Sequence, residues 1–147
     1  MKALLQRVSQ ARVEIDGQVV GAIDLGLLLL LCAEHGDDAA IAQRMLDKIL
    51  KLRIFSDDAG KMNRSLQDVA GGLLVVSQFT LAADVRGGNR PSFTQAAPPA
   101  EGRRLYDDFL ERARAAHPKV ESGVFGADMQ VHLVNQGPVT IPIQMSA

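Results

Sequence analysis

The sequence predicts one mixed α/β domain, in which a largely antiparallel sheet forms a barrel-like core beside two main helices. The chain has 147 residues, the length of one ordinary domain, and no internal repeat or low-complexity linker divides it. Hydrophobic residues make up 47% and charged residues 22%, which is typical of a chain that buries a core. Apolar residues recur with the period of strands in several segments and with the period of a helix in two. We therefore treat residues 1–147 as a single domain.

The first part of the chain predicts three strands. The first strand alternates small or apolar residues with polar ones, at Ser9, Ala11, Val13 and Ile15. Asp16-Gly17 predicts a hairpin turn, and residues 19–23 supply the returning strand. The leucine run at residues 27–32 predicts a strand buried on both faces.

Two segments have the spacing of amphipathic helices. Asp37-Asp38 can cap the first helix, and Pro98-Pro99 opens the second. Arg104 and Asp108 can pair outside the apolar face of the second helix. The apolar faces comprise Ile41, Met45, Leu46, Ile49 and Leu50 in the first helix, and Leu105, Phe109 and Ala113 in the second.

Further segments complete the sheet. Residues 52–55 are expected to return to strand before a turn at residues 57–60. Residues 73–76 predict a buried strand that leads directly into Ser77-Gln78-Phe79-Thr80. The tail alternates at Met129, Val131 and Leu133, breaks at residues 135–138, and resumes at Val139, Ile141 and Ile143.

Charge and cysteine content narrow the function. The formal net charge is -1, so any RNA binding must come from a local basic patch or from recognition of one nucleotide. The single cysteine, Cys32, allows no intramolecular disulfide, which fits a reducing compartment, and we expect it to be a small buried residue. The N-terminus becomes polar too soon for a signal peptide, and the leucine run is far short of the roughly 20 residues that span a bilayer. We expect a soluble, cytoplasmic protein without a membrane partner.

The usual catalytic equipment is scarce. His35, His117 and His132 lie far apart and match no zinc spacing. No phosphate-binding loop, dinucleotide fingerprint or nucleophile elbow is present. We therefore expect neither a metal nor a cofactor.

Two segments remain as candidates for a site. Ser77-Gln78-Phe79-Thr80 follows a buried strand, where α/β folds commonly place their sites, although its hydroxyls could simply satisfy the strand end. Gly137-Pro138 interrupts the tail strands, where a cis peptide is plausible and a plain turn is the alternative.

Three motifs occur in a fixed order: Ser77-Gln78-Phe79-Thr80-Leu81, Gly88-Asn89-Arg90-Pro91-Ser92-Phe93 and Asn135-Gln136-Gly137-Pro138-Val139-Thr140. In this order they resemble the motifs of the D-aminoacyl-tRNA deacylase family. The resemblance covers nearly the whole chain and includes the hairpin from Arg7-Val8 to Gly21 and residues 52–55, 60–63 and 123–129. One position departs, since Gln136 stands where most bacterial members have aspartate. A related deacylase branch carries different residues at both Ser77–Thr80 and Gly137-Pro138.

The resemblance implies a homodimer with its active sites at the subunit interface. Gly137-Pro138 of one subunit, with a cis bond, would reach into the partner's pocket as a chiral filter. Its carbonyls would hold the amino group of the substrate and leave no room for an L side chain. Glycine, which has no side chain, would pass this filter, so hydrolysis of glycyl-tRNA is an expected side activity.

The resemblance also implies the reaction, hydrolysis of the ester of D-aminoacyl-tRNA, with Ser77, Gln78, Phe79 and Thr80 as the catalytic segment. An aminoacyl ester is already activated, so a positioned water and a stabilised oxyanion can suffice, helped in this family by the 2′-hydroxyl of the terminal ribose. Backbone N–H groups around Phe79 and Thr80 are the candidates for the oxyanion hole. Thr80 as a covalent nucleophile is the rival, and it needs a base that the sequence does not supply.

RNA contacts are expected from scattered cations and from one aromatic residue. Gln78 and Phe79 are candidates to recognise or stack on the terminal adenine, although Phe79 could equally belong to the core. The phosphate-binding candidates are Lys48, Lys51, Arg53, Lys61, Arg64, Arg86 and Arg90. Two other functions stay open, an inactive nucleic-acid-binding module of the same fold and a small-molecule esterase that uses Thr80 or Ser77.

Overall fold

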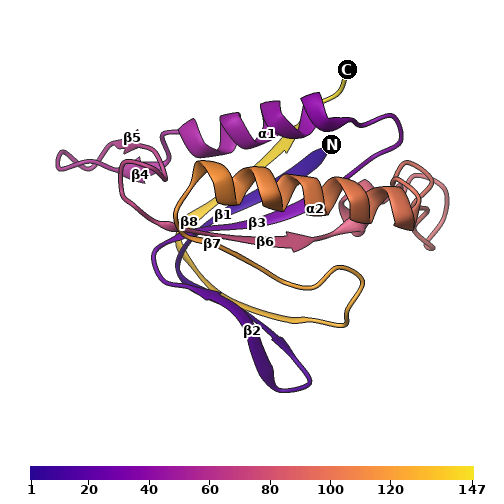
Figure 1. The fold of residues 1–147 in the computed structure, drawn as a ribbon, viewed down its shortest axis with the longest axis horizontal. Coiled ribbons are helices and arrows are strands. Elements are labelled where there is room, and N and C mark those ends of the chain that lie inside the picture. The colour runs from indigo at the N-terminus through magenta and orange to yellow at the C-terminus, as the bar shows by residue number, and fades with distance from the viewer.

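The computed structural model describes residues 1–147 (Figure 1). The strands are β1 (Lys2–Ile15), β2 (Gln18–Ile23), β3 (Gly26–Cys32), β4 (Phe55–Ser56), β5 (Met62–Arg64), β6 (Gly72–Ser77), β7 (Val120–Ser122) and β8 (Gln130–Gln144). The helices are α1 (Ala39–Lys51) and α2 (Pro99–Ala116), and η1 (Phe79–Ala82) is a short 3-10 turn. Neither helix combines the length and the apolar character that a membrane crossing requires. The predicted mixed α/β fold with two main helices is confirmed.

One long strand organises the sheet. The strand order is β2-β1-β3-β6-β7, and β8 pairs with β1 outside this path. β1 is antiparallel to β2, β3 and β8, whereas β6 is parallel to both β3 and β7. The residues of β1 up to Val8 lie between β3 and β8, and those from Ala11 onward lie between β2 and β8. The sheet is therefore largely antiparallel, as predicted, although β1 begins seven residues before the alternation at Ser9.

Close approach of the outer strands nearly closes the sheet into a barrel. β2 packs against β7, and a Cβ added to Gly21 would lie 2.5 Å from the carbonyl oxygen of Ser122. Only glycine permits two backbones to come this close. The predicted barrel-like core is confirmed.

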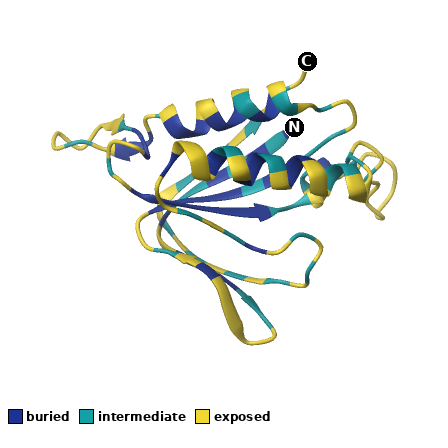
Figure 2. Cartoon of the chain, viewed as in Figure 1, coloured by how far each residue is buried: buried dark blue, intermediate teal, exposed yellow.

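Two hydrophobic clusters lie on the two sides of the sheet. The larger one fills the space between the sheet and the helices, whose inner faces are buried in Figure 2. The smaller one lies inside the barrel and is formed by Val8, Ala11, Val13, Leu28, Leu74 and Val76. Successive leucines of β3 serve both clusters, because Leu27 and Leu29 face the helices while Leu28 faces the barrel. Each such side chain contributes about 1.5–3 kcal/mol of transfer free energy when buried.

Both helices begin as the sequence predicts. Asp38 caps α1, and its carboxylate accepts a hydrogen bond of 2.9 Å from the N–H of Ile41. Pro99 is the first residue of α2. All the residues predicted for the two apolar faces are buried.

Two local predictions are wrong. Residues 52–55 do not return to strand as a unit, because only Phe55 reaches a pairing partner, on β5. The carbonyl of Ile54 instead accepts a hydrogen bond from the Arg7 side chain. Arg104 and Asp108 do not pair: Arg104 binds Glu101 one turn earlier, and Asp108 binds Arg112 at 2.8 Å. Each side chain has a partner of opposite charge on the same helix face, so the pair between them is not formed.

Candidate functional site

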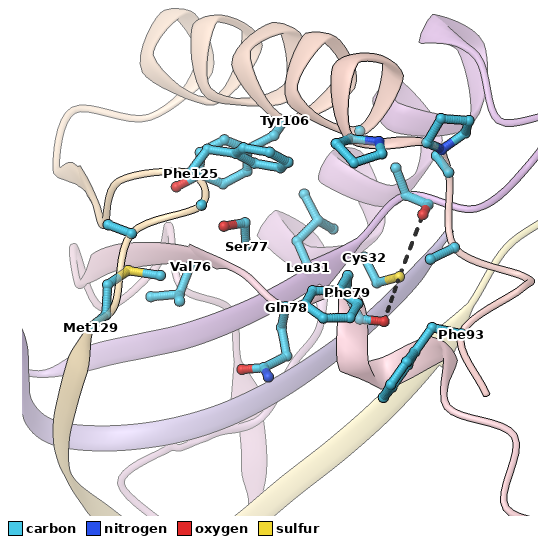
Figure 3. Close-up of a pocket in the computed structure, with 18 of the residues that line it drawn as sticks. Leu31, Cys32, Val76, Ser77, Gln78, Phe79, Phe93, Tyr106, Phe125 and Met129 are labelled. Carbon is cyan, nitrogen blue, oxygen red and sulfur yellow. Dashed lines mark hydrogen bonds between the residues drawn. The ribbon is translucent and has the colours of Figure 1, made fainter. Parts of the chain in front are cut away.

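A cavity of about 650 Å³ opens where β3 and β6 end. These strands are parallel, so their carboxyl ends meet at one edge of the sheet, with Leu31 opposite Ser77. Leu31, Cys32, Val76 and Ser77 line this end of the cavity (Figure 3). The segment that the sequence singled out after β6 thus borders this cavity.

The other walls come from segments distant in the sequence. Tyr106 of α2 and Phe125 of the loop before β8 stand together on one side, with ring centroids 5.8 Å apart. The Tyr106 hydroxyl donates a hydrogen bond of 2.8 Å to the carbonyl of Val75, which fixes α2 on β6. Met129 and Phe93 complete the apolar lining. Periodicity could not have found these residues, because the cavity exists only once the three segments are folded together.

The predicted catalytic segment borders this cavity, but not all of its residues line it. Ser77, Gln78 and Phe79 line it, whereas Thr80 is not among the lining residues. The Gln78 side-chain amide donates a hydrogen bond to the Thr80 hydroxyl. Phe79 is 60% exposed and lies edge-on to Phe93, with 5.1 Å between the ring centroids. Phe79 is therefore not a core residue.

The cavity is poor in groups that titrate near neutral pH. Its lining contains no histidine, and Asp128 is its one carboxylate. Burial, with a smaller effect of Glu34, raises the pKa of Cys32 to about 11, so this residue is a neutral thiol. Its Sγ–H donates to the Phe79 carbonyl at 3.6 Å (Figure 3). No cluster of three His, Cys, Asp or Glu side chains is placed to hold a metal ion.

Gly137 and Pro138 lie in a bulge of β8. Asn135 pairs with Val8 and Thr140 with Gln6, so the four residues between them face Arg7 alone. The Gly137–Pro138 peptide bond is cis. The sequence predicted that the tail breaks into two strands at residues 135–138, whereas β8 is one strand in which pairing with β1 is interrupted only at this bulge.

Two polar side chains fix the bulge. Asn135 Oδ1 accepts a hydrogen bond of 2.7 Å from Val139 N, and Asn135 Nδ2 donates one of 2.9 Å to Thr140 Oγ1. Arg7 Nε donates a hydrogen bond of 2.9 Å to the carbonyl of Gln136. The contact at position 136 is thus made by the main chain, so the departure to glutamine leaves it intact. Sequence reasoning quoted Arg7 and Asn135 only within motifs and missed this role.

Within one chain, the cavity lies at the carboxyl ends of β3 and β6, whereas the bulge lies level with their opposite ends, in the middle of the longer strands β1 and β8. Ser77 is level with Leu31 and Ala3, whereas the bulge is level with Arg7, four residues further along β1. At about 3.3 Å per residue this is about 13 Å along the strands. The path from β6 to β8 also crosses β3 and β1, which adds three spacings of about 4.8 Å. One protomer therefore does not bring Gly137-Pro138 to its own Ser77–Thr80 segment.

The cations expected to bind RNA are divided between the same two ends. Lys48, Lys51, Arg53 and Lys61 lie at the end of α1 and at the hairpin of β4 and β5, left in Figure 1. Arg64 lies there too and pairs with Asp58 at 3.1 Å. Arg86 and Arg90 lie in the loop that carries Phe93, beside the cavity. Arg86 forms an ion pair with Asp84 at 2.6 Å. Of the two arginines of this loop, Arg90 is therefore the one that remains free.

Comparison with known proteins identifies the family. Residues 4–144 match the family model described as D-Tyr-tRNA(Tyr) deacylase. The D-aminoacyl-tRNA deacylase of Variovorax paradoxus (strain S110) is 77% identical over 146 residues, which cover 99% of this chain and 100% of the relative. That of Aromatoleum aromaticum (strain DSM 19018 / LMG 30748 / EbN1) is 66% identical over 145 residues, which cover 99% of this chain and 95% of the relative.

Two solved structures agree with this. The c-Myc DNA Unwinding Element Binding Protein superposes with a TM-score of 0.95 at 41% identity and covers 100% of both chains. A probable eukaryotic D-amino acid tRNA deacylase superposes with a TM-score of 0.81 at 18% identity, covers 97% of both chains, and supports the fold alone. The family indicated by the motifs is therefore confirmed: this chain belongs to the D-Tyr-tRNA(Tyr) deacylase family.

Proposed function

We propose that the protein hydrolyses the ester bond of D-aminoacyl-tRNA and releases a free D-amino acid and tRNA. The observation that carries this proposal is the apolar cavity of about 650 Å³ beside Ser77-Gln78-Phe79, in a chain of the D-Tyr-tRNA(Tyr) deacylase family. A cavity of this size can enclose a small ligand or one end of a larger one. The enzyme would act in the cytoplasm, with aminoacyl-tRNA as its partner, and its one free cysteine is compatible with a reducing compartment.

The chemistry we propose uses the reactivity of the substrate itself. An aminoacyl ester needs a positioned water and a stabilised oxyanion more than it needs a strong base. Phe79 and Thr80 begin η1, and no side chain caps their N–H groups, so these amides are available to an oxyanion. The 2′-hydroxyl of the substrate's terminal ribose would assist, in place of the absent histidine.

A covalent role for Thr80 is the weaker alternative. Its hydroxyl contacts the amide of Gln78, which is no base, and it does not line the cavity. Replacing Thr80 with alanine tests this role directly. Activity near that of the wild type would exclude Thr80 as the nucleophile.

Selection of the D enantiomer would come from a second copy of the chain. We propose a homodimer in which Gly137-Pro138 of one protomer enters the cavity of its partner. The separation of the bulge from the cavity within one chain supports this arrangement. Main-chain carbonyls at the bulge would hold the amino group and exclude an L side chain. Glycine esters would pass the same filter.

RNA would be held by few contacts. The exposed ring of Phe79 is available to stack on the terminal adenine. If it does, a Phe79→Ala variant should bind the aminoacyl-adenosine end more weakly, and unchanged affinity would contradict the stacking role. Arg90 and the cations at the β4–β5 end would supply phosphate contacts.

One observation favours a second candidate function, nucleic-acid binding without catalysis. The relative with 41% identity is described as a binding protein of a DNA unwinding element. Such a module would bind nucleic acid whatever amino acid is attached. This second function leaves the cavity beside Ser77-Gln78-Phe79 without a role. We therefore prefer the hydrolase.

The deciding experiment compares release of tyrosine from D-tyrosyl-tRNA and L-tyrosyl-tRNA by the purified protein. Rapid release from the D ester alone is the expected result. Equal loss of both esters would indicate a general esterase without a chiral filter. Binding of tRNA with no release from either ester would establish the binding module instead.

A further inference from the structure

Four exposed cations gather at the end of the molecule opposite the cavity. Lys48 and Lys51 lie in the last turn of α1, Arg53 follows the helix, and Lys61 lies just before β5. All four side chains are exposed, and none of them takes part in an ion pair within 4 Å. We call these four residues the basic end (left in Figure 1).

Carboxylates of the same segments are already bound by other groups: Asp47 accepts a hydrogen bond from Gln43, and Asp57 accepts hydrogen bonds from the N–H groups of Ala59 and Lys61. Asp58 pairs with Arg64 at 3.1 Å. Asp68 accepts a hydrogen bond of 2.8 Å from Ser65 N, and hydrogen bonds from Ser65, with smaller effects of Arg64 and Arg53, lower its pKa. The cations of the basic end are therefore free to bind an anion from outside the chain.

One side chain ties the basic end to the Gly137-Pro138 bulge. Arg7 Nη1 donates a hydrogen bond of 2.9 Å to the carbonyl of Ile54, and Arg7 Nε donates one of 2.9 Å to the carbonyl of Gln136. Ile54 follows Arg53 directly and leads into the β4–β5 hairpin. Wherever the bulge lies in an assembly, Arg53 therefore lies beside it, and the rest of the basic end follows from the same helix end and hairpin.

This inference rests on the proposed function, in which the bulge of one protomer lies at the partner's cavity. We propose that the basic end of one protomer binds phosphates of the tRNA acceptor end whose ester lies in the cavity of its partner. Beside the cavity itself, the loop that borders it carries Arg86, which Asp84 holds, and the free Arg90. Each tRNA is thus held by both protomers, with the ester in one and most of its phosphate contacts in the other.

The chemistry of the basic end fits phosphates better than bases. Lysine is a compact, strongly hydrated point charge that lacks the planar bidentate fork of arginine, and three of the four residues are lysines. Such contacts give salt-dependent affinity that is nearly independent of sequence. The basic end would therefore serve tRNAs of different identity equally.

The first test removes two of these charges in the dimeric protein. The variant Arg53→Gln/Lys61→Gln should raise KM for D-tyrosyl-tRNA about 10-fold and leave kcat unchanged. The slope of log KM against log salt should fall by about 1.5, since each lost phosphate contact accounts for about 0.7–0.9. Hydrolysis of D-tyrosyl-adenosine, which has no phosphate, should stay at the wild-type rate.

A matched control removes two charges from the outer faces of the helices. The variant Arg44→Gln/Arg114→Gln changes the net charge equally and should leave KM for D-tyrosyl-tRNA unchanged. If the basic-end variant keeps the wild-type KM and salt slope, the proposal is wrong. Loss of the dimer in that variant would also overturn it, because the basic end would then be a protein contact.

Mixed dimers test whether the basic end that binds the tRNA phosphates belongs to the protomer whose cavity holds the ester or to its partner. One protomer carries Arg53→Gln/Lys61→Gln, and the other carries Ser77→Trp, which fills its cavity. If the basic end acts across the interface, the one open cavity faces an intact basic end, so KM is normal and kcat per dimer is about half that of the wild type. If the basic end acts within its own chain, the open cavity has the defective basic end and KM is raised, which overturns the proposal.

A wild-type protein that leaves both D-tyrosyl-tRNA and D-tyrosyl-adenosine intact would refute the proposed function, and this inference with it. Normal hydrolysis of D-tyrosyl-adenosine with any of the contrary results above refutes the inference alone.

Discussion

The two ends of the molecule are built from different groups. At the cavity end, apolar side chains from distant segments form the walls, and burial raises the pKa of Cys32 to about 11 and that of Tyr106 to about 12. At the opposite end, the bulge presents main chain that Arg7 and Asn135 fix by hydrogen bonds. Side chains can change rotamer, so under the proposed function they would let the cavity adapt to substrate side chains of different size. A fixed main chain cannot yield in this way, so it would suit the chiral filter that we propose for the bulge.

Filling the cavity should have the largest effect. Ser77 lies at the end of β6 and lines the cavity, so Ser77→Trp should occupy the space of the substrate and reduce hydrolysis of D-tyrosyl-tRNA at least about 100-fold. Ser77→Ala, which removes the hydroxyl but keeps the space, is the matched control and should retain most activity. Steady-state rates and a circular dichroism spectrum check both variants. Equal inactivity of Ser77→Ala would show that the hydroxyl itself takes part in the reaction.

Burial of Cys32 at the cavity end should slow the reaction of its thiol with an alkylating reagent. Burial first, and then Glu34, raise the pKa of its thiol from 9.0 to about 11, and the thiolate is the reactive form. At pH 8 the folded protein should therefore react with iodoacetamide about 100-fold more slowly than the denatured chain, which carries the same thiol with its ordinary pKa.

The same shift has a consequence for stability. A raised folded-state pKa contributes to the free energy of unfolding while the thiol is protonated in both states, below pH 9.0. This contribution is lost as the pH rises towards about 11. Urea unfolding across this range, compared with Cys32→Ala, measures it. An alkylation rate equal to that of the denatured chain would contradict a buried thiol.

A side chain added at Gly137 should strain the bulge and reduce activity without changing the residues that line the cavity of the same chain. Gly137 has φ +143°, and a Cβ there would lie 2.9 Å from Val139 Cγ2 and 3.2 Å from Arg7 Nη2. Gly137→Ala should therefore cost about 1–3 kcal/mol of strain and reduce kcat/KM for D-tyrosyl-tRNA about 10-fold. Gly87→Ala, at a position with open space around it, is the control and should be neutral. Unchanged kcat/KM in Gly137→Ala would remove the bulge from the proposed site.

The sequence predicted the elements that depend on local pattern. The leucine run, the Asp38 cap and the faces of both helices follow from periodicity and turn chemistry, and the structure contains all of them. The predicted break at residues 135–138 is present as a bulge within one strand. The strand at residues 52–55 was not a sound prediction, because strand formation needs a partner, and the Arg7 side chain occupies Ile54 instead.

The candidate site was predictable only in part. Ser77-Gln78-Phe79 could be located from the buried strand before it. Tyr106, Phe125 and Met129 could not, because each looks like an ordinary core residue until the fold brings their segments together. The division of the cations between two ends was also invisible, since it follows from topology rather than from spacing.

The smallest effect should come from Tyr106→Phe. The Tyr106 hydroxyl donates to the carbonyl of Val75, which also accepts a hydrogen bond of 3.1 Å from Gly123 N, so one partner remains. Burial raises the pKa of Tyr106 to about 12, so the hydroxyl is a neutral donor at any ordinary assay pH. Its loss should cost about 1 kcal/mol of unfolding free energy, measurable by urea titration, with activity within about twofold of the wild type.

The same variant also tests how cleanly the two ends are separated. Tyr106 belongs to the cavity end and has no contact with the bulge of its own chain, and its ring should still pack on Phe125 after the change. The ratio of D-tyrosyl-tRNA to L-tyrosyl-tRNA hydrolysis should therefore stay at the wild-type value. A shift of this ratio would mean that side chains of the cavity select the enantiomer. It would contradict the proposal that the main chain of the bulge is the chiral filter. An unchanged ratio here, with a changed one in Gly137→Ala, would assign the choice to the bulge.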